Sequence, residues 1–568
     1  MISRPLCLTI VCAIAAAASS LDAQVAKPAI PHLRRQGTAT QLVVGGEPFL
    51  ILGGELGNSS ASNIAYMEGR WAALKQMNVN TVLAPAYWEM IEPREGAFDF
   101  RTVDALIAQA RARQLRVVLL WFGSWKNSMS SYVPEWVKKD PSRFPRTEAT
   151  RGQRQEILAP YDSSNWSADA KAFRALMRHL REIDGTTHTV IMVQVENEIG
   201  MLPEARDHSG RADSLFAASV PAALMSHIRA NEASLTTELR TKWVANGRKT
   251  SGSWASVFGA DVYTDELFMA WHFADYTQHV AAAGKQEYAL PMYVNAALIR
   301  PNYLPGRYVS AGPLPHLMDV WHAAAPAIDL LSPDIYFPNF REWTDRYRRS
   351  DNPLFIPEAS LGARSATNAL YAFGTHEAIG FSPFSIESAT NPPENRIGKS
   401  YAMLRQLAPV ILAHQGRGAM AGVIPVIPFD GVVDAQPQVV TLNGLQYGLT
   451  VSFALPRPQP VAATNDAPVA AVVFGDAGRD YAGPIAGAIV IALGPDEVLI
   501  AGTGVSVTFA TLGEPASQAG IVTAHKGRYL NGRWVVDQWM NGDQTDQGRS
   551  VRLESNEFTI QRVRLYRY

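Results

Sequence analysis

The sequence is poor in cysteine and carries almost no net charge. Its 568 residues include two cysteines, Cys7 and Cys12, both near the N-terminus. If that segment is removed on export, no disulfide framework, thiolate metal site or cysteine nucleophile remains. The 51 basic residues nearly cancel the 52 acidic ones. Because there is no basic excess, we expect no nucleic-acid partner.

The N-terminal segment has the pattern of an export signal. Arg4 precedes an apolar run at residues 6–18, and small residues follow as far as Ala23. This run has the length of a signal-peptide centre and is too short to cross a bilayer as a helix. We therefore expect residues 1–23 to be a signal peptide. The mature chain would be periplasmic or extracellular in a bacterium, without a membrane anchor.

The rest of the chain divides into three parts, as expected for a length that exceeds one ordinary core. Residues 24–44 are predicted to be a linker and an N-terminal strand, with residues 24–36 loose and a hairpin at Gly45-Gly46. Residues 45–415 alternate between short apolar runs and helical stripes. Residues 416–568 lack helical stripes and show short strands separated by turns.

Residues 45–415 predict an α/β fold, a (β/α)8 TIM barrel. Eight apolar runs, mostly separated by helical patterns, match that architecture, and helices are predicted near residues 59–77, 103–110, 173–183 and 399–414. The alternative is a doubly wound open sheet, which is disfavoured because no Gly-rich phosphate loop follows an early strand. The predicted strands are residues 49–52, 81–84, 117–121, 190–193, 291–294, 328–331, 354–356 and 379–384.

The C-terminal segment, residues 416–568, predicts a separate all-β domain that resembles a β-sandwich. Asn531-Gly532 lies between two apolar stretches and is a strong signal for a two-residue hairpin. No strand of this segment ends in paired carboxylates. We therefore expect the domain to support the barrel without taking part in catalysis.

Carboxylates follow two of the predicted barrel strands. The fourth strand ends in Glu196-Asn197-Glu198, and the seventh ends in Glu358. Such residues can simply form loop salt bridges. However, catalytic groups of barrel enzymes sit at the carboxyl ends of strands. A retaining glycosidase needs one acid and one nucleophilic carboxylate about 5–5.5 Å apart. Two such strand ends therefore favour glycosidase chemistry.

Three motifs carry a resemblance to a known family. Residues 195–200 read Val-Glu-Asn-Glu-Ile-Gly, residues 87–100 contain Trp, Glu-Pro, Gly and Phe-Asp-Phe, and Gly54-Glu55 follows the first strand. Together they resemble glycoside hydrolase family 35, the β-galactosidases, within the clan of retaining (β/α)8 glycosidases. The resemblance covers roughly residues 45–415.

The resemblance implies a role for each matching residue. Glu198 would be the acid/base and Glu358 the nucleophile. Asn197 would bind the sugar 2-hydroxyl, and Glu196 would bind another hydroxyl. Tyr336, after the sixth strand, resembles the tyrosine that steadies the nucleophile.

Further polar and aromatic residues at strand ends are candidates for binding substrate. Glu55 ends the first strand, Trp121 the third and Asn295 the fifth. Trp121 could stack on a sugar face, as could Trp88 and Trp125, and packing in the core is the alternative for each. The histidines show no metal-ligand spacing. We expect neither a metal nor a cofactor.

The sequence therefore predicts a retaining exo-β-galactosidase with two catalytic glutamates. Its substrates would be terminal β-D-galactosyl residues of oligosaccharides or plant polysaccharide fragments. One alternative is another retaining β-glycosidase, either a β-glucosidase or an endo-acting enzyme. Another is a carbohydrate-binding barrel without catalysis. The expected partner is the carbohydrate, and the oligomeric state, including a homodimer, is left open.

Overall fold

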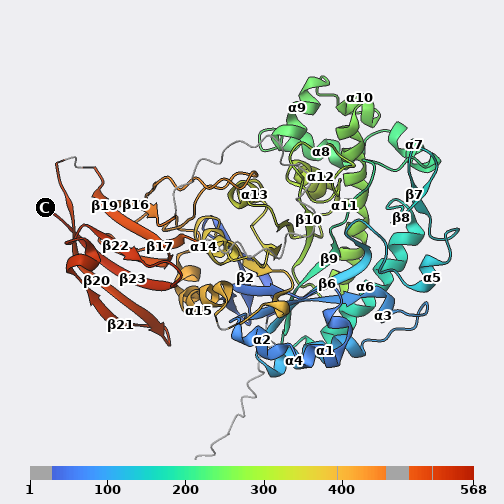
Figure 1. The fold of residues 1–568 in the computed structure, drawn as a ribbon. Helices are drawn as coiled ribbons and strands as arrows, with labels where there is room; N and C mark the ends of the chain where they lie inside the picture. The colour runs from blue at the N-terminus through green and yellow to red at the C-terminus, as the bar shows by residue number, and fades with distance from the viewer. Residues whose placement is uncertain (1–28, 393, 456–484, 514–515) are drawn as a thin grey trace, which may run out of the picture.

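Eight parallel strands close into a barrel, and an all-β region lies beside it (Figure 1). This computed structural model describes residues 29–392, 394–455, 485–513 and 516–568. The predicted signal peptide lies outside the described residues. None of the helices in the described part has the length and apolar character needed to cross a membrane.

The barrel strands confirm all eight predicted runs. Neighbouring strands pair in parallel, and the last strand pairs with the first, so the sheet has no free edge. The fourth and seventh strands in chain order are β9 and β12. In order, the barrel strands are β4 (Ile51–Glu55), β5 (Thr81–Tyr87), β6 (Arg116–Lys126), β9 (Val190–Asn197), β10 (Met292–Ala297), β11 (Leu330–Ile335), β12 (Ile356–Ala359) and β13 (Gly380–Pro383).

Helices surround the barrel, and their apolar faces bury against its strands. Three of the predicted helices are confirmed as α4, α6 and α15. The long helices are α4 (Arg101–Ala112), α6 (Ser163–Asp184), α11 (Val262–Glu287), α14 (Ser365–Thr375) and α15 (Arg396–His414), with the shorter α12 (Met318–Ala324) and α13 (Phe340–Tyr347).

The helix predicted at residues 59–77 is wrong as a single element. It is divided into η1 (Ser60–Ser62), α1 (Ile64–Glu68) and α2 (Trp71–Gln76). Gly69 ends α1, and a glycine favours the end of a helix over its interior. Met67, Trp71 and Leu74 are buried as the apolar spacing predicts, whereas Ile64 is exposed.

Four short helices lie between β9 and α11 and enlarge the barrel (Figure 1). In the sequence they lie between Glu198 and Glu358, the two glutamates predicted to be catalytic. They are α7 (Gly210–Ala217), α8 (Ala222–Ala230), α9 (Thr237–Ala245) and α10 (Trp254–Phe258). Other short elements are α3 (Trp88–Ile91), α5 (Glu135–Lys138), η2 (Pro315–Leu317), η3 (Ile386–Ser388) and the ribbon β7 (Arg146–Glu148) with β8 (Arg154–Leu158).

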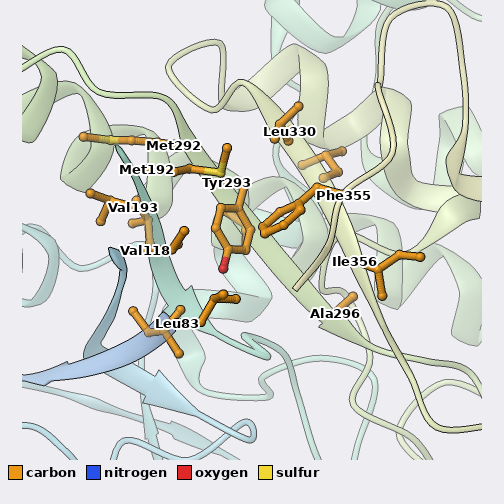
Figure 2. Packing of buried hydrophobic residues seen from close by; sticks show 14 of the residues in the cluster. Leu83, Val118, Met192, Val193, Met292, Tyr293, Ala296, Leu330, Phe355 and Ile356 are labelled. Atoms are coloured by element: carbon orange, nitrogen blue, oxygen red, sulfur yellow. The ribbon is translucent and has the colours of Figure 1, made fainter. Parts of the chain in front are cut away.

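Apolar side chains from different strands fill the barrel (Figure 2). Leu83, Val118 and Met192 are fully buried. Tyr293 of β10 and Phe355, just before β12, meet edge to face with ring centroids 5.0 Å apart. Aromatic pairs in this arrangement add to the stabilisation that comes from burial alone. The carboxyl ends of the strands, where the predicted site residues lie, are therefore supported by a packed core.

A small antiparallel sheet precedes the barrel. It consists of β1 (His32–Gln36), β2 (Ala39–Val44) and β3 (Glu47–Phe49). The pairing of Val44 with Glu47 confirms the hairpin predicted at Gly45-Gly46. Residues 32–36, predicted to be part of a loose linker, instead form β1, which pairs with β2 along its whole length.

The described part of the C-terminal region contains two antiparallel sheets that pack as a sandwich. Asn531-Gly532 joins β20 to β21, as predicted. The first sheet has the order β14 (Met420–Val423), β17 (Gly487–Gly494), β18 (Glu497–Thr503), β23 (Thr559–Arg567), β20 (Ala519–Leu530) and β21 (Arg533–Met540). The second contains β15 (Gln438–Val440), β16 (Tyr447–Phe453), β19 (Val505–Thr511) and β22 (Ser550–Leu553), with η5 (Gly542–Thr545) preceding β22.

The first sheet of the sandwich also packs against the barrel. Along β17, Ile489 and Ile491 belong to the core shared with the barrel, whereas Ala488 and Val490 face the second sheet. This alternation follows from the two-residue period of a strand. Both faces of β17 are therefore buried, and contacts with α14 and α15 fix the C-terminal region to the barrel.

Candidate active site

Glu198 and Glu358 meet at the carboxyl-terminal mouth of the barrel. Glu198 directly follows β9, and Glu358 lies in β12. Carboxylate oxygens of Glu198, Glu358 and Asp334 all lie within 4.8 Å of one another. Glu198 is 3% and Glu358 5% exposed. The separation matches the short spacing of a retaining glycosidase, which leaves no room for a water between the two groups.

Tyr336 holds one side of Glu358. It follows β11, and its hydroxyl donates a hydrogen bond to Oε1 of Glu358. The other oxygen, Oε2, is buried and has no hydrogen-bond donor among the described residues. One oxygen of the carboxylate is thus fixed, while the other is left to react.

Glu198 is held by two amide side chains. Asn127 Nδ2 donates a hydrogen bond to Glu198 Oε2. The backbone N–H of Glu198 donates to Asn295 Oδ1 at 3.0 Å. Burial, followed by the negative charge of Glu358, raises the pKa of Glu198 to about 7, and the charge of Lys126 opposes this shift. A carboxyl group with this pKa retains its proton near neutral pH and can act as a general acid.

Asn197 and Lys126 form the polar wall beside the two glutamates. They occupy paired positions of β9 and β6, and Lys126 Nζ donates to Asn197 Oδ1 at 2.8 Å. Asn197 Nδ2 is buried and has no acceptor among the described residues. Although burial alone would lower the pKa of Lys126, the surrounding carboxylates, led by Glu358, raise it. Lys126 is therefore a buried cation, and Asn197 has a free donor.

Glu55 ends β4 and lies close to Glu358. It is 1% exposed, and neither of its carboxylate oxygens has a donor among the described residues. Burial, followed by the charge of Glu358, raises the pKa of Glu55 well above its usual range. Burial and this charge therefore favour the protonated form of Glu55, whose hydroxyl can donate to a neighbouring oxygen.

The carboxylates at the mouth are also spaced closely enough to hold a metal ion. Lys126 interacts with Glu55, Glu198, Asp334 and Glu358, and so already supplies a positive charge in their midst. The arrangement suits two carboxyl groups with different protonation states, which is what acid and nucleophile roles require.

Two family models match separate parts of the chain. One, of glycoside hydrolase family 42 and described as "Beta-galactosidase", matches residues 62–247. The other, a domain of unknown function (DUF5597), matches residues 397–552.

A curated β-galactosidase from Xanthomonas manihotis is 28% identical over 217 residues, which are 37% of this chain. The chain covers 32% of that relative's length.

Solved structures with a similar fold include two β-galactosidases. The enzyme from Bacillus circulans sp. alkalophilus gives a TM-score of 0.44 at 13% identity, covering 64% of this chain and 57% of that chain. A GH42 β-galactosidase from G. stearothermophilus gives a TM-score of 0.43 at 14% identity, with the same coverage. The catalytic domain of a β-amylase from Paenibacillus polymyxa gives a TM-score of 0.42 at 12% identity, covering 62% of this chain and 98% of that chain.

These matches correct the family expected from the motifs. The matching model is that of family 42, not family 35. The three motifs that carried the resemblance, at residues 54–55, 87–100 and 195–200, therefore did not distinguish family 35 from family 42. The broader expectation, a glycosidase of this clan, agrees with the matches.

Glu196 does not face the sugar site, in contrast to the expected role. Its Oε2 accepts from the backbone N–H of Trp125 at 2.8 Å, and its carboxyl lies against Asp169 of α6. Both carboxyl groups are fully buried between the barrel wall and the helices. Burial, followed by the charge of Asp169, raises the pKa of Glu196 well above its usual range. Glu196 is thus part of a buried polar cluster behind the wall.

Trp121 is also directed away from the mouth, so the stacking role is corrected. It is fully buried, packs on Phe173 of α6 at 5.5 Å, and donates from Nε1 to Asp169 at 2.8 Å. Trp88 and Trp125 are equally buried. For all three tryptophans, the packing alternative is the one that the structure shows.

Three site residues were not predicted: Lys126, Asn127 and Asp334. Lys126 ends β6, Asn127 follows it, and Asp334 lies near the end of β11. Their signal was the same as that of the glutamates, a polar residue at the end of an apolar strand. Lys126 and Asn127 were obscured because β6 extends well beyond the predicted run, through residue 126. Asn295 lies at the site as a hydrogen-bonding partner of Glu198 and Asp334.

Proposed function

We propose that this chain is a retaining exo-β-galactosidase of the family 42 type, which removes terminal β-D-galactosyl residues from oligosaccharides or plant polysaccharide fragments. The observation that carries the proposal is the pair of buried glutamates whose carboxylate oxygens lie within 4.8 Å at the barrel mouth. The match of residues 62–247 to a β-galactosidase model supports galactose as the sugar.

In the first step, Glu358 attacks the anomeric carbon through its unpartnered Oε2. Glu198 gives its proton to the glycosidic oxygen, so the aglycone leaves as a neutral alcohol. The hydrogen bond from Tyr336 stabilises Glu358 as a carboxylate before attack. The negative charge of Glu358 contributes to the raised pKa of Glu198, which therefore carries the proton that this step requires.

In the second step, the galactosyl ester of Glu358 is hydrolysed. Esterification removes the negative charge of Glu358, so the pKa of Glu198 falls and the residue can act as a base. Glu198 takes a proton from water, which attacks the anomeric carbon and releases Glu358 as a carboxylate. Two inversions at the same carbon give net retention.

The polar wall would bind the galactosyl ring. Asn197 Nδ2 has no acceptor among the residues that the structure describes and is placed to donate to a sugar hydroxyl next to the reacting carbon. Lys126 orients Asn197 by donating to its Oδ1 at 2.8 Å. In its protonated form, which burial favours, Glu55 would donate to a hydroxyl or to Glu358.

The roles of the two glutamates can be tested by chemical rescue of the variant Glu198→Ala. This variant should retain the glycosylation step with dinitrophenyl β-galactoside, because that leaving group needs little protonation. Added azide should accelerate turnover and give β-galactosyl azide, since a small anion attacks the intermediate without a base. An α-galactosyl azide would mean that the two roles are reversed.

The sugar specificity is tested with the intact chain on a panel of aryl glycosides. β-Galactosides should be turned over much faster than β-glucosides or β-xylosides, with retention of configuration by NMR. Faster turnover of β-glucosides would replace the galactosidase proposal with another retaining β-glycosidase. No turnover of any glycoside, with sugar binding intact, would favour a carbohydrate-binding barrel.

We also propose that the protein is exported and acts outside the cytoplasm. The support is the sequence pattern of residues 1–23, a short basic start followed by an apolar run and small residues. Mass spectrometry of the N-terminus after cell fractionation tests this. An intact Met1 in the cytoplasmic fraction would contradict it.

A further inference from the structure

A third carboxylate, Asp334, lies between the two glutamates at the mouth. It is 2% exposed, and in the parallel ladder it pairs with Glu358. Its oxygens lie within 4.8 Å of those of both Glu198 and Glu358. The mechanism above needs only two carboxyl groups, so the third needs an explanation.

Asn295 fixes Asp334 relative to Glu198. Asn295 Nδ2 donates to Asp334 Oδ2 at 2.6 Å, and Asn295 Oδ1 accepts from the backbone N–H of Glu198 at 3.0 Å. The same amide therefore holds the side chain of Asp334 and the backbone of Glu198. The remaining oxygen, Asp334 Oδ1, is buried and has no donor from the other described residues.

Carboxyl oxygens of Asp334 and Glu198 lie within 4.8 Å of each other, and both side chains are buried. Two ionised carboxylates repel each other at this distance, so the pair favours a state in which it holds one proton. When two carboxyl groups share a site, the second proton leaves only at a raised pH.

We propose that Asp334 is a positioning residue for the general acid, sharing one proton with Glu198 and keeping it available to the leaving group at higher pH than Glu198 alone would. This inference rests on the proposed glycosidase function. When Glu198 gives its proton to the glycosidic oxygen, Glu198 and Asp334 are both left ionised. In the same step the Glu358 carboxylate becomes a neutral ester, so the net charge of the site is unchanged.

Charged and titratable groups from each neighbouring strand act on this pair. Burial, followed by the charges of Glu358, Glu198 and Glu55, raises the pKa of Asp334 well above its usual range, and Lys126 opposes the shift. The phenols of Tyr293, Tyr336 and Tyr347 also interact with Asp334. A neutral residue at position 334 removes one negative charge from the deprotonated pair, so the shared proton should be lost at lower pH.

The test compares Asp334→Asn with Asp329→Asn. Asp329 precedes β11 at the opposite end of the strand, where it accepts from Lys285 at 2.6 Å, so the control makes the same chemical change away from the mouth. The measurement is kcat/KM against pH for phenyl β-galactoside, which needs an acid, and for dinitrophenyl β-galactoside, which does not.

In Asp334→Asn, the alkaline limb for phenyl β-galactoside should move to lower pH by about one unit, the size of a moderate like-charge effect. For dinitrophenyl β-galactoside, which needs no acid, the alkaline limb should stay at the same pH. Asp329→Asn should leave both profiles in place. Asp334→Ser, which is smaller and equally uncharged, should show the same shift as the asparagine variant and guards against a folding defect of one replacement.

An unmoved alkaline limb in both folded Asp334 variants would overturn the proposal, as would an equal loss with both leaving groups. Failure of the proposed function has a different signature, wild-type inactivity towards all aryl galactosides. In that case, NMR titration of ¹³C-labelled glutamate carboxyl carbons still measures the pH at which Glu198 loses its proton. A Glu198 transition that stays at the same pH in Asp334→Asn would then overturn it.

Discussion

Strand β9 carries two glutamates two positions apart that lie in different environments. Glu198 lies at the barrel mouth beside Glu358 and Asp334, whereas Glu196 lies behind the wall against Asp169. Both are almost completely buried, and both have a raised pKa. A perturbed pKa therefore does not identify the acid by itself. Placement next to a second reactive carboxylate separates the two residues.

The backbone explains how neighbouring glutamates come to face different ways. Glu196 has φ +62° and Glu198 has φ +45°, in the left-handed region that non-glycine residues seldom adopt. These angles interrupt the regular alternation of side chains at the end of the strand. Each such residue costs about 1–3 kcal/mol, and residues of this kind cluster at functional sites.

The largest contrast is expected between Glu198→Gln and Glu196→Gln. Loss of the general acid should lower kcat/KM for phenyl β-galactoside by about 10²–10⁴-fold. Glu196→Gln removes the titratable carboxyl group but keeps an oxygen that can accept from Trp125, so its activity should stay within about tenfold of wild type. Steady-state kinetics of the two purified variants makes the comparison. An equal loss in a correctly folded Glu196→Gln would mean that the cluster behind the wall takes part in catalysis.

A second contrast concerns two aromatic residues, Tyr336 at the mouth and Trp121 behind the wall. Tyr336→Phe deletes a hydrogen bond to a charged group, worth about 1.5–3 kcal/mol, and should lower kcat by roughly 10–100-fold. Trp121→Phe leaves Asp169 with one donor fewer in a buried site, and should lower the free energy of unfolding by about 1–3 kcal/mol.

Kinetics and urea unfolding separate these two effects. The expected pattern is a defect in turnover for Tyr336→Phe and a defect in stability for Trp121→Phe. Slow turnover in a fully stable Trp121→Phe would place that residue in the site after all.

The elements that depend on local pattern could be predicted from the sequence. The eight barrel strands are apolar runs, and the helices α4, α6 and α15 have clear stripes, so these were found. Glu198 and Glu358 were found because each follows an apolar strand. The direction of Glu196 could not be found in this way, because it depends on one left-handed residue and on Asp169 from a different helix.

Partnerships between distant strands were equally out of reach. Lys126, Asp334 and Asn295 come from β6, β11 and β10, and only the closed barrel brings them together around Glu198. Trp121 ends the predicted third strand, so its position suggested the mouth. Its side chain faces α6, and a strand that is apolar on both faces does not reveal which side chains point inwards.

In stability, the two glutamates should behave alike. The pKa of each is higher in the folded chain than in the unfolded one, so the folded state binds more protons between those two pKa values. The free energy of unfolding contributed by each group therefore falls as pH rises through this window. For Glu198 the window extends to about pH 7.

Glu198→Gln and Glu196→Gln should thus both raise Tm by a few degrees at pH 8, with a smaller gain at pH 5. Calorimetric scans at the two pH values test this. A lower Tm at pH 8 for either variant would show that its carboxylate is stabilised by the fold rather than strained by burial. If both variants raise Tm equally but only Glu198→Gln loses activity, both carboxyl groups are destabilised by burial and only Glu198 takes part in catalysis.

Substitutions of three acidic residues in the C-terminal β region should have the smallest effect on activity and stability, because these carboxylates are exposed whereas those of the barrel mouth are buried. These three residues are solvated and have local partners. Asp537 pairs with Arg528 across the β20–β21 hairpin, Asp543 accepts from Gln547, and Asp546 pairs with Arg549. Exposed ion pairs of this kind contribute about 0–1 kcal/mol each. The hairpin belongs to the sandwich beside the barrel (Figure 1).

Asp537→Asn, Asp543→Asn and Asp546→Asn, each made in the intact chain, should therefore keep kcat/KM within about twofold and shift the free energy of unfolding by about 0.5 kcal/mol or less. Asparagine is well suited to position 546, where φ is +48°, because it tolerates the left-handed region as aspartate does. Deletion of the whole region would be a poor substitute for these variants. It would remove Ile489 and Ile491 and expose the apolar surface of the barrel against which they pack, so the protein would be destabilised for reasons unrelated to catalysis. A drop of several orders of magnitude in the turnover of one of these three variants, with its circular dichroism and Tm unchanged, would mean that the C-terminal region takes part in the reaction. The solvated carboxylates of this region would then no longer differ in function from the buried carboxylates of the barrel.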